Sequence, residues 1–333
     1  MKNGLQRFEY YLLKVEGLFS NAIKERNPGL WLYNNDARTS FFMLEGLAKV
    51  YAELHNKKRF SKMKEDFKLV EDALGAVDYY DSFAKEFEKK EIVNTAIVEY
   101  LHAQSREKIQ HLNDILQQRG WVEGSADRLR KIRKKLTDAN WLKDEKEVVG
   151  IAAFYKDTIK EIKTFASETK CKFTDIETEV HAIRRKLRWL SIYPRALQGM
   201  IQLTDRNVAD EKVVKYLTDE IVNSAFNVMT DAGNNLYFLM LEKKYFLALS
   251  WMISELGKLK DSGLRIMITS EALQQTKSVS QSEALALSYQ FLGDEQQKLS
   301  SILSRSSEIC GNFFAEKNLD KLISGIAFAN QSK

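Results

Sequence analysis

Apolar residues recur along this chain with the period of an amphipathic α-helix. In the first segment Phe8, Leu12 and Val15 share one helical face, and Asn27-Pro28-Gly29 ends it. The same period predicts further helices over residues 36–55, 60–73, 76–91, 93–118, 125–137, 145–170, 175–204, 209–230, 232–260, 264–275, 280–302 and 306–329. Short β-branched stretches such as 266–269 fit a helix or a strand, but no long stretch alternates apolar with polar residues. The pattern predicts an all-α fold.

Composition agrees with this fold class. The 333 residues include 2 prolines and 15 glycines, so the chain has few tight turns to make. This scarcity argues against β-sandwiches, barrels and Rossmann-type sheets, which need many turns. Pro194 lies inside a predicted helix and should kink or end it. The links between helices are short and polar, and if the chain has two lobes they join near residue 170.

The cysteines and the apolar runs bear on the cellular compartment. Cys171 and Cys310 are far apart in the chain and have no CxxC spacing, so no zinc site or disulfide framework is predicted. Charged residues interrupt the N-terminal segment, and no uncharged run has the length of a membrane span. We therefore expect a cytoplasmic protein without a membrane partner.

One helix concentrates chemically active side chains. Its segment His181-Ala182-Ile183-Arg184-Arg185-Lys186-Leu187-Arg188 places His181, Arg184 and Arg188 on one stripe, with Arg185 at its margin. Aligned like charges repel by about 0.2–0.5 kcal/mol per pair, so this stripe needs an anionic partner. The partner is either a set of carboxylates from neighbouring helices or an external polyanion, whose phosphate oxygens guanidinium groups bind in bidentate fashion.

No other motif indicates an enzyme. The chain has no glycine-rich phosphate loop, no Gly-x-Ser-x-Gly turn and no recognisable Cys/His pair. Glu99-x-x-His102 has the spacing of a di-iron ligand pair, but a second such pair is missing. We therefore predict a non-enzymatic protein without a cofactor or a metal.

A faint internal repeat accompanies the basic helix. Asn35-Asp36-Ala37-Arg38 resembles the segment from His181 to Arg184, with asparagine in place of histidine. Leu74-Gly75 follows the first copy and Leu256-Gly257 the second, each with carboxylates nearby. The distance from helix motif to Leu-Gly is longer in the second copy, which predicts an insertion there.

A duplicated helix of the form His-x-x-Arg-x-x-x-Arg, followed by Leu-Gly-x-x-(basic)-Asp, resembles the conserved histidine α-helical domain (CHAD) family. His181, Arg184, Arg188, Leu256 and Gly257 match in the second copy, with Lys260 and Asp261 completing the pattern. The first copy keeps Arg38, Leu74, Gly75 and Asp81, but Phe42 and Asp78 replace expected arginines. Many relatives are fused to a CYTH-type triphosphatase domain, which we do not expect in this protein.

The resemblance implies one domain over 1–333, made of two helical-bundle halves related by pseudo-twofold symmetry. The halves would span about 30–170 and 171–330, after an N-terminal helix in 1–29. The resemblance also implies a bacterial or archaeal protein that binds inorganic polyphosphate, often at polyphosphate granules. The implied polyphosphate-binding residues are His181, Arg184, Arg188 and Arg38, then Arg185, Arg195, Arg128, Lys131 and Lys135.

Two classes of function remain as predictions from sequence. The first is non-enzymatic binding of a polyanion, above all inorganic polyphosphate, by a basic face between two helical bundles. The second is a helical scaffold for protein–protein interaction whose arginines form internal salt bridges, with a protein partner or a second copy bound to its helices. Nucleic acid is disfavoured, because the aromatic residues of the C-terminal third lack basic flanks.

Overall fold

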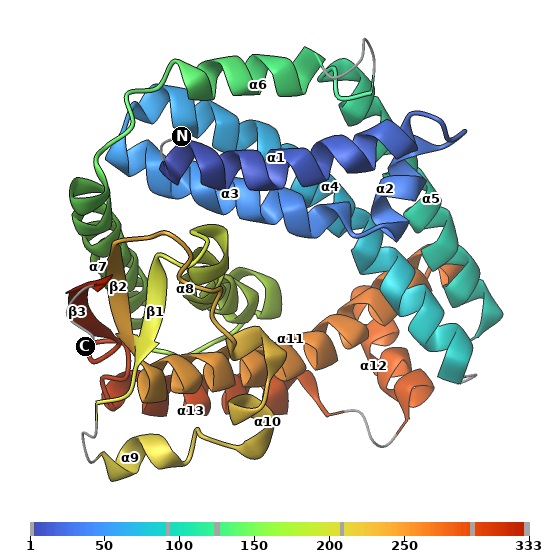
Figure 1. Ribbon diagram of the computed structural model, residues 1–333. Helices are drawn as coiled ribbons and strands as arrows, with labels where there is room; N and C mark the ends of the chain where they lie inside the picture. Colours follow the sequence, from blue (N-terminus) through green and yellow to red (C-terminus); the bar gives the residue numbers. More distant parts are fainter. Residues whose placement is uncertain (1–2, 91–93, 123–126, 207–209, 294–296, 330–333) are drawn as a thin grey trace. The chain divides into compact units, whose positions relative to one another are not determined.

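A computed structural model describes residues 3–90, 94–122, 127–206, 210–293 and 297–329. Within these ranges α-helices predominate, so the all-α prediction is confirmed, and a small three-stranded sheet accompanies them (Figure 1). The chain divides into two compact units. Unit 1 comprises Met1–Trp141 and Arg265–Gln296, and unit 2 comprises Leu142–Leu264 and Gln297–Lys333.

Unit 1 is a bundle of helices. Its helices are α1 (Asn3–Ala22), α2 (Pro28–Asn34), α3 (Ala37–Leu54), α4 (Lys57–Lys90), α5 (Thr95–Gln118), α6 (Asp127–Thr137), the end of α11 (Lys243–Lys277) and α12 (Gln281–Leu292). Helices α1 and α3 lie side by side, and α3 packs along α4 (Figure 1). The predicted helices 60–73 and 76–91 are one helix, α4, because Gly75 lies within it without breaking it.

Aromatic side chains fill the core of unit 1. Tyr51 is fully buried, with its ring centroid 5.6 Å from that of Phe8 and 5.2 Å from that of Trp141. The Tyr51 hydroxyl accepts a 2.7 Å hydrogen bond from buried Arg7. The apolar face that Phe8 marks in the sequence is therefore the face that α1 buries against α3.

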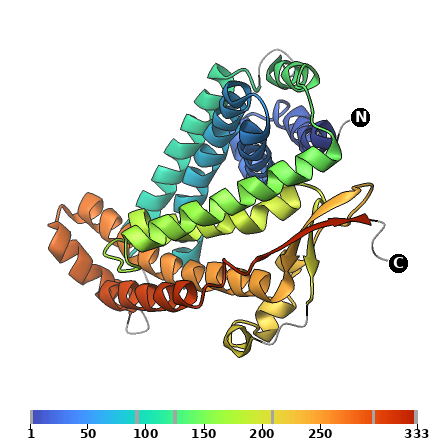
Figure 2. The ribbon, with the colours of Figure 1, turned by 90° about the vertical axis from the view of Figure 1, so that its left-hand side faces the viewer.

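Unit 2 combines helices with the sheet. Its elements are α7 (Asp144–Glu168), the π-helical turn η1 (Ile176–His181), α8 (Ala182–Ala196), β1 (Ile201–Thr204), α9 (Glu211–Val214), α10 (Asp219–Val222), the 3-10 turn η2 (Ala225–Asn227), β2 (Tyr237–Glu242), the first part of α11, α13 (Leu299–Ala315) and β3 (Ile323–Phe328). The strand order is β1-β2-β3, with β1 parallel and β3 antiparallel to β2 (Figure 2).

Several predicted helices of unit 2 were wrong. Residues 201–204, 237–242 and 323–328 form strands inside the segments predicted as helices 175–204, 232–260 and 306–329. In the segment predicted as helix 209–230, the described residues 210–230 form only the short helices α9 and α10 and the turn η2. Short apolar runs such as Tyr237–Glu242 fit either structure, and pairing with neighbouring strands decides for the sheet. The ambiguous stretch 266–269 is helical, within α11.

The division into units differs from the predicted halves. It falls between Trp141 and Leu142 and again within α11, and the predicted join near residue 170 lies inside unit 2. The reason is that α7 packs against α8: the Phe154 ring lies 5.1 Å from the Tyr193 ring. Helix α7 therefore belongs with the basic helix that follows it.

Pro194 does not stop α8 at once, since the helix continues to Ala196. A proline at this position has no N–H to donate to the carbonyl of Leu190, four residues earlier. The hydroxyl of fully buried Tyr155, from α7, donates to that carbonyl instead. A side chain of α7 thus supplies the hydrogen bond that Pro194 removes.

Candidate functional site

The candidate site in unit 2 begins at the π-helical turn η1, which precedes α8. Asp175 caps it: its carboxylate accepts a 2.7 Å hydrogen bond from the backbone N–H of Thr178 and a 2.8 Å bond from the Thr178 hydroxyl. These hydrogen bonds lower the pKa of Asp175. The turn ends at His181, so the first residue of the basic motif stands where the backbone changes from π to α geometry.

His181 is paired within its own helix. Its Nδ1 lies 2.9 Å from Oε1 of Glu177, one turn earlier. The hydrogen bond from His181 lowers the pKa of Glu177, burial opposes this, and the charges of His181, Lys260 and Arg185 lower the pKa further. The same interactions show that Lys260 of α11 and Arg185 lie close enough to Glu177 to act on its charge. One carboxylate therefore stands among several cations.

Arg184 crosses α11 at Gly257. A Cβ on Gly257 would lie 3.0 Å from Nε and 3.1 Å from Nη2 of Arg184, so only glycine leaves ordinary room for the guanidinium. Nε donates a 3.2 Å hydrogen bond to the carbonyl of Ile253. Burial lowers the pKa of Arg184, and the charge of Asp261 opposes this effect. Arg184 thus joins α8 to α11 through a largely desolvated contact.

The remaining cations of α8 differ in their surroundings. Arg185 and Arg188 are exposed, three residues apart on the same helix. Nζ of Lys186 lies 5.3 Å from the Phe165 ring centroid, against α7. Arg195 lies over the Phe226 ring at 5.2 Å, and its Nη2 donates a 3.2 Å hydrogen bond to the carbonyl of Ala225. Arg185 and Arg188 are therefore the members of the motif that face water.

Arg38, the matching arginine of unit 1, is held by carboxylates. Its Nε donates to Glu71 at 2.8 Å and its Nη1 to Asp78 at 3.1 Å. The guanidinium crosses α4 at Gly75, where a Cβ would lie 2.6 Å from Nη2. Arg38 thus passes over Gly75 as Arg184 passes over Gly257, but Arg38 is neutralised by carboxylates.

Two of the three predicted cations of α6 are also paired. Arg128 forms an ion pair with Asp66, whose side chain is 8% exposed, and Lys131 forms one with Asp127. The backbone carbonyl of Lys135 accepts a 3.1 Å hydrogen bond from Arg59. Arg133 lies between Glu9 and Glu16, with hydrogen bonds of 2.8–3.2 Å to their carboxylates. Helix α6 is thus tied to α1 and α4 by charge pairs.

The structure separates the predicted set into two groups. The first group belongs to unit 2: His181, Arg184, Arg185, Arg188 and Arg195. Lys260, also in unit 2, is not among the site residues predicted from sequence, although it matches the basic position of the second Leu-Gly segment. The second group belongs to unit 1: Arg38, Arg128, Lys131 and Lys135. Only the first group keeps exposed arginines on the motif helix itself.

The described residues also bear on metal binding and on membrane crossing. Among the described residues, no three or more His, Cys, Asp or Glu side chains are grouped so that they would hold a metal ion. No described helix combines the length and the apolar character that crossing a bilayer requires. Cys171 and Cys310 are buried free thiols, and burial raises the pKa of both.

Comparison with protein-family models found no match. Comparison with curated protein sequences found none either, and neither did comparison with solved structures.

Proposed function

We propose that this protein is a non-enzymatic binder of a polyanion, through the cations of α8 and α11 in unit 2. The observation that carries the proposal is the exposure of Arg185 and Arg188 on the helix that Arg184 anchors against Gly257. His181 and Lys260 extend this set, which we call the α8 cation cluster: His181, Arg184, Arg185, Arg188 and Lys260. Inorganic polyphosphate is the polyanion that the resemblance to CHAD proteins favours.

The cluster suits a chain of phosphates for physical reasons. An anchored helix holds its guanidinium groups at fixed spacing, and each group can bind phosphate oxygens as a bidentate donor. The imidazole of His181 adds a ring N–H donor to this set. Each cation that pairs with a phosphate releases counterions, so we expect affinity that falls as salt rises. Glu177 and Asp261 offset part of the positive charge and reduce this dependence.

The contact of an arginine with a helix glycine in both units supports a duplicated arrangement. Arg38 crosses Gly75 and Arg184 crosses Gly257, as the order of the two sequence motifs predicts. Two residues separate α3 from α4, whereas β1, α9, α10, η2 and β2 separate α8 from α11. This difference accounts for the longer spacing of the second copy.

The carboxylate pairs of unit 1 favour the second candidate, a helical scaffold. Arg38, Arg128 and Arg133 each meet acids of the same unit, as expected of arginines that stabilise a bundle. We therefore limit the proposed polyanion site to unit 2, and we assign the arginines of unit 1 to internal pairing.

Titration with inorganic polyphosphate at two salt concentrations tests the proposal. The wild-type chain is compared with Arg185→Ala/Arg188→Ala, which removes two exposed cations and leaves Arg184 in place. The matched control is Lys58→Ala/Lys134→Ala, which removes two exposed cations from unit 1. We expect weaker binding in the first variant only, with affinity falling as salt rises. A wild-type chain that does not bind at low salt, or equal loss in both variants, favours the scaffold.

A further inference from the structure

A groove in unit 2 lies apart from the α8 cation cluster, between α7 and β3. Its volume is about 730 Å³, which is within the range of ligand pockets. Lys156, Lys160 and Lys163 line it from α7, spaced as neighbours on one helical face, and Ile323 to Gly325 line it from β3. Buried Ile159 and Leu319 form an apolar floor.

The wall formed by β3 is the edge of a sheet. The strand order β1-β2-β3 places β3 at one end, so β2 pairs with only one of its sides. Within the described residues no strand pairs with its other side. Gly325 has a φ of +149°, and no neighbouring atom lies within 4 Å of the position that a Cβ would take. A second backbone can therefore approach the strand there. Ile326 adds an exposed apolar side chain, 46% accessible, to the same strand.

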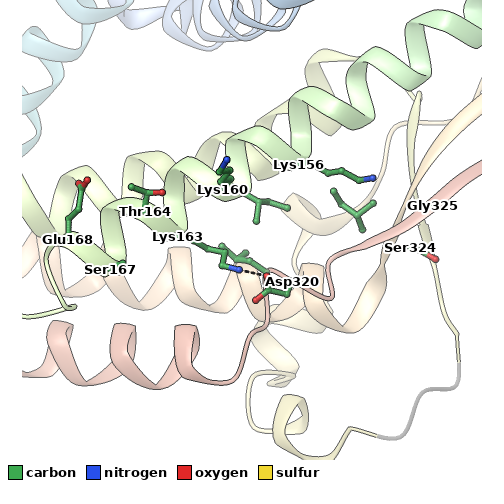
Figure 3. Close-up of a pocket in the computed structure, with 12 residues that line it drawn as sticks. Lys156, Lys160, Lys163, Thr164, Ser167, Glu168, Asp320, Ser324 and Gly325 are labelled. Carbon is green, nitrogen blue, oxygen red and sulfur yellow. Dashed lines mark hydrogen bonds and ion pairs between the residues drawn. The ribbon is translucent and has the colours of Figure 1, made fainter.

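The charges of the groove select what can approach this edge. Figure 3 shows Lys163 joined to Asp320, and Lys156 extending from α7 toward the Gly325 end of β3. Among the described residues, neither Lys156 nor Lys160 forms an ion pair, and Glu168 lies at the far end of the lining. Lysines beside an edge strand repel basic strands and lose hydration when a neutral strand covers them, which is a common protection against aggregation. They attract an acidic strand.

The groove also has the dimensions of a short extended peptide. Its lining on α7 runs from Lys156 to Glu168, which is about 18 Å of helix. Asp320 lies opposite Lys163 and Gly325 lies toward Lys156, so β3 and α7 run along the groove together (Figure 3). About five residues of extended chain cover this length.

We propose that the groove between α7 and the open edge of β3 binds an extended acidic peptide by strand addition. The peptide backbone pairs with the outer side of β3. Alternate side chains then face α7, where acidic ones meet Lys156 and Lys160, and the side chains between them lie on the other face of the added strand. This site and its ligand are distinct from the α8 cation cluster and polyphosphate.

Fluorescence anisotropy with three labelled seven-residue peptides tests the proposal on the full chain. The first alternates glutamate with valine, the second alternates lysine with valine, and the third has the first sequence with two valines replaced by proline. We expect the first peptide to bind and the second not to bind. The third should bind about tenfold more weakly, because proline cannot donate to a strand ladder.

Variants of the lysines identify the groove. Lys156→Glu/Lys160→Glu should weaken binding of the acidic peptide by about tenfold or more, because two attractions become repulsions. Lys146→Glu is the control, on the same helix and exposed but outside the groove. Arg185→Ala/Arg188→Ala should leave peptide binding unchanged, which separates this test from that of the proposed polyanion site.

Four outcomes would overturn the proposal. They are no binding of the acidic peptide, equal binding of its proline form, equal loss in Lys146→Glu and the double variant, and complete displacement by inorganic phosphate at the peptide's own concentration. The last result would indicate a general anion site in place of a peptide groove.

Discussion

The guanidinium of Arg184 lies across Gly257, as that of Arg38 lies across Gly75 in the other unit. In each unit a long helix, α4 or α11, carries a glycine where an arginine of another helix passes over it. A glycine inside a helix costs about 1 kcal/mol relative to alanine, but at these two positions a Cβ would lie too close to the arginine. This relationship supplies the first test.

Gly257→Ala should fail to stabilise the chain. The new methyl group would lie 3.0 Å from Arg184 Nε and displace the guanidinium from its hydrogen bond to Ile253. Gly311→Ala in α13 is the matched control, because no neighbouring atom lies within 4 Å of the position that the new Cβ would take. This substitution should raise the free energy of unfolding by about 0.5–1 kcal/mol. Urea unfolding of both variants measures the difference. An equal gain at the two positions would show that the contact with Arg184 is unimportant.

Arg38→Met should destabilise the chain by about 1–2 kcal/mol, because it leaves Glu71, whose side chain is 9% exposed, without its partner. The estimate is at the lower end because the Arg38 side chain is 40% exposed. Adding Glu71→Gln should restore most of the loss. Arg185→Met, which removes an exposed cation, should change the free energy of unfolding by less than about 0.5 kcal/mol. Similar losses for Arg38→Met and Arg185→Met would contradict internal pairing of Arg38.

Tyr155→Phe should cost about 1–3 kcal/mol, because it leaves the buried carbonyl of Leu190 without a donor. Burial raises the pKa of Tyr155, which keeps the hydroxyl protonated as a donor at neutral pH. Pro194→Ala supplies a backbone N–H four residues after Leu190. The loss from Tyr155→Phe should therefore be smaller when Pro194→Ala is present. A double-mutant cycle by chemical denaturation measures this coupling, and additive losses would disprove it.

Glu45, on α3, predicts a pH dependence of stability. The residue is 6% exposed; burial raises its pKa to about 7, with Glu71 and Asp72 adding to the rise and Lys68 and Lys49 opposing it. Because the folded pKa lies above the unfolded value of 4.5, the stabilisation is fully present below pH 4.5 and is lost as pH rises through 7.

We expect Glu45→Gln to remove this loss of folding stability. One pKa unit corresponds to about 1.4 kcal/mol, so the loss amounts to about 3 kcal/mol at most. The measurement compares the free energy of unfolding of wild type and variant at pH 5 and pH 8. The variant should gain much more on the wild type at pH 8 than at pH 5, because most of the loss develops between these pH values. The same difference between the two proteins at both pH values would show that Glu45 does not titrate in this range.

Much of the helical structure is predictable, because helical periodicity is a local property. The face of α1 marked by Phe8 and Val15 is the one that is buried, and the basic helix begins close to its predicted start at Asp175. The strands were missed because each is only four to six residues long, and in segments this short only pairing with another strand separates a strand from a helix. The helical spacing of Lys156, Lys160 and Lys163 can be seen in the sequence. The strand edge opposite them, in residues 323–325, cannot be predicted from it, because these residues lie about 160 positions further along the chain.

The sequence by itself determined the helical fold class and the order of the two arginine and glycine motifs, since both depend on residues close together in the chain. Only the tertiary structure decided which cations are neutralised. Arg38 meets Glu71 and Asp78, 33 and 40 positions away, whereas Arg185 lies exposed on α8. Spacing along a helix aligns charges on a face, but the free energy of each charge depends on the carboxylates and the water that packing brings to it.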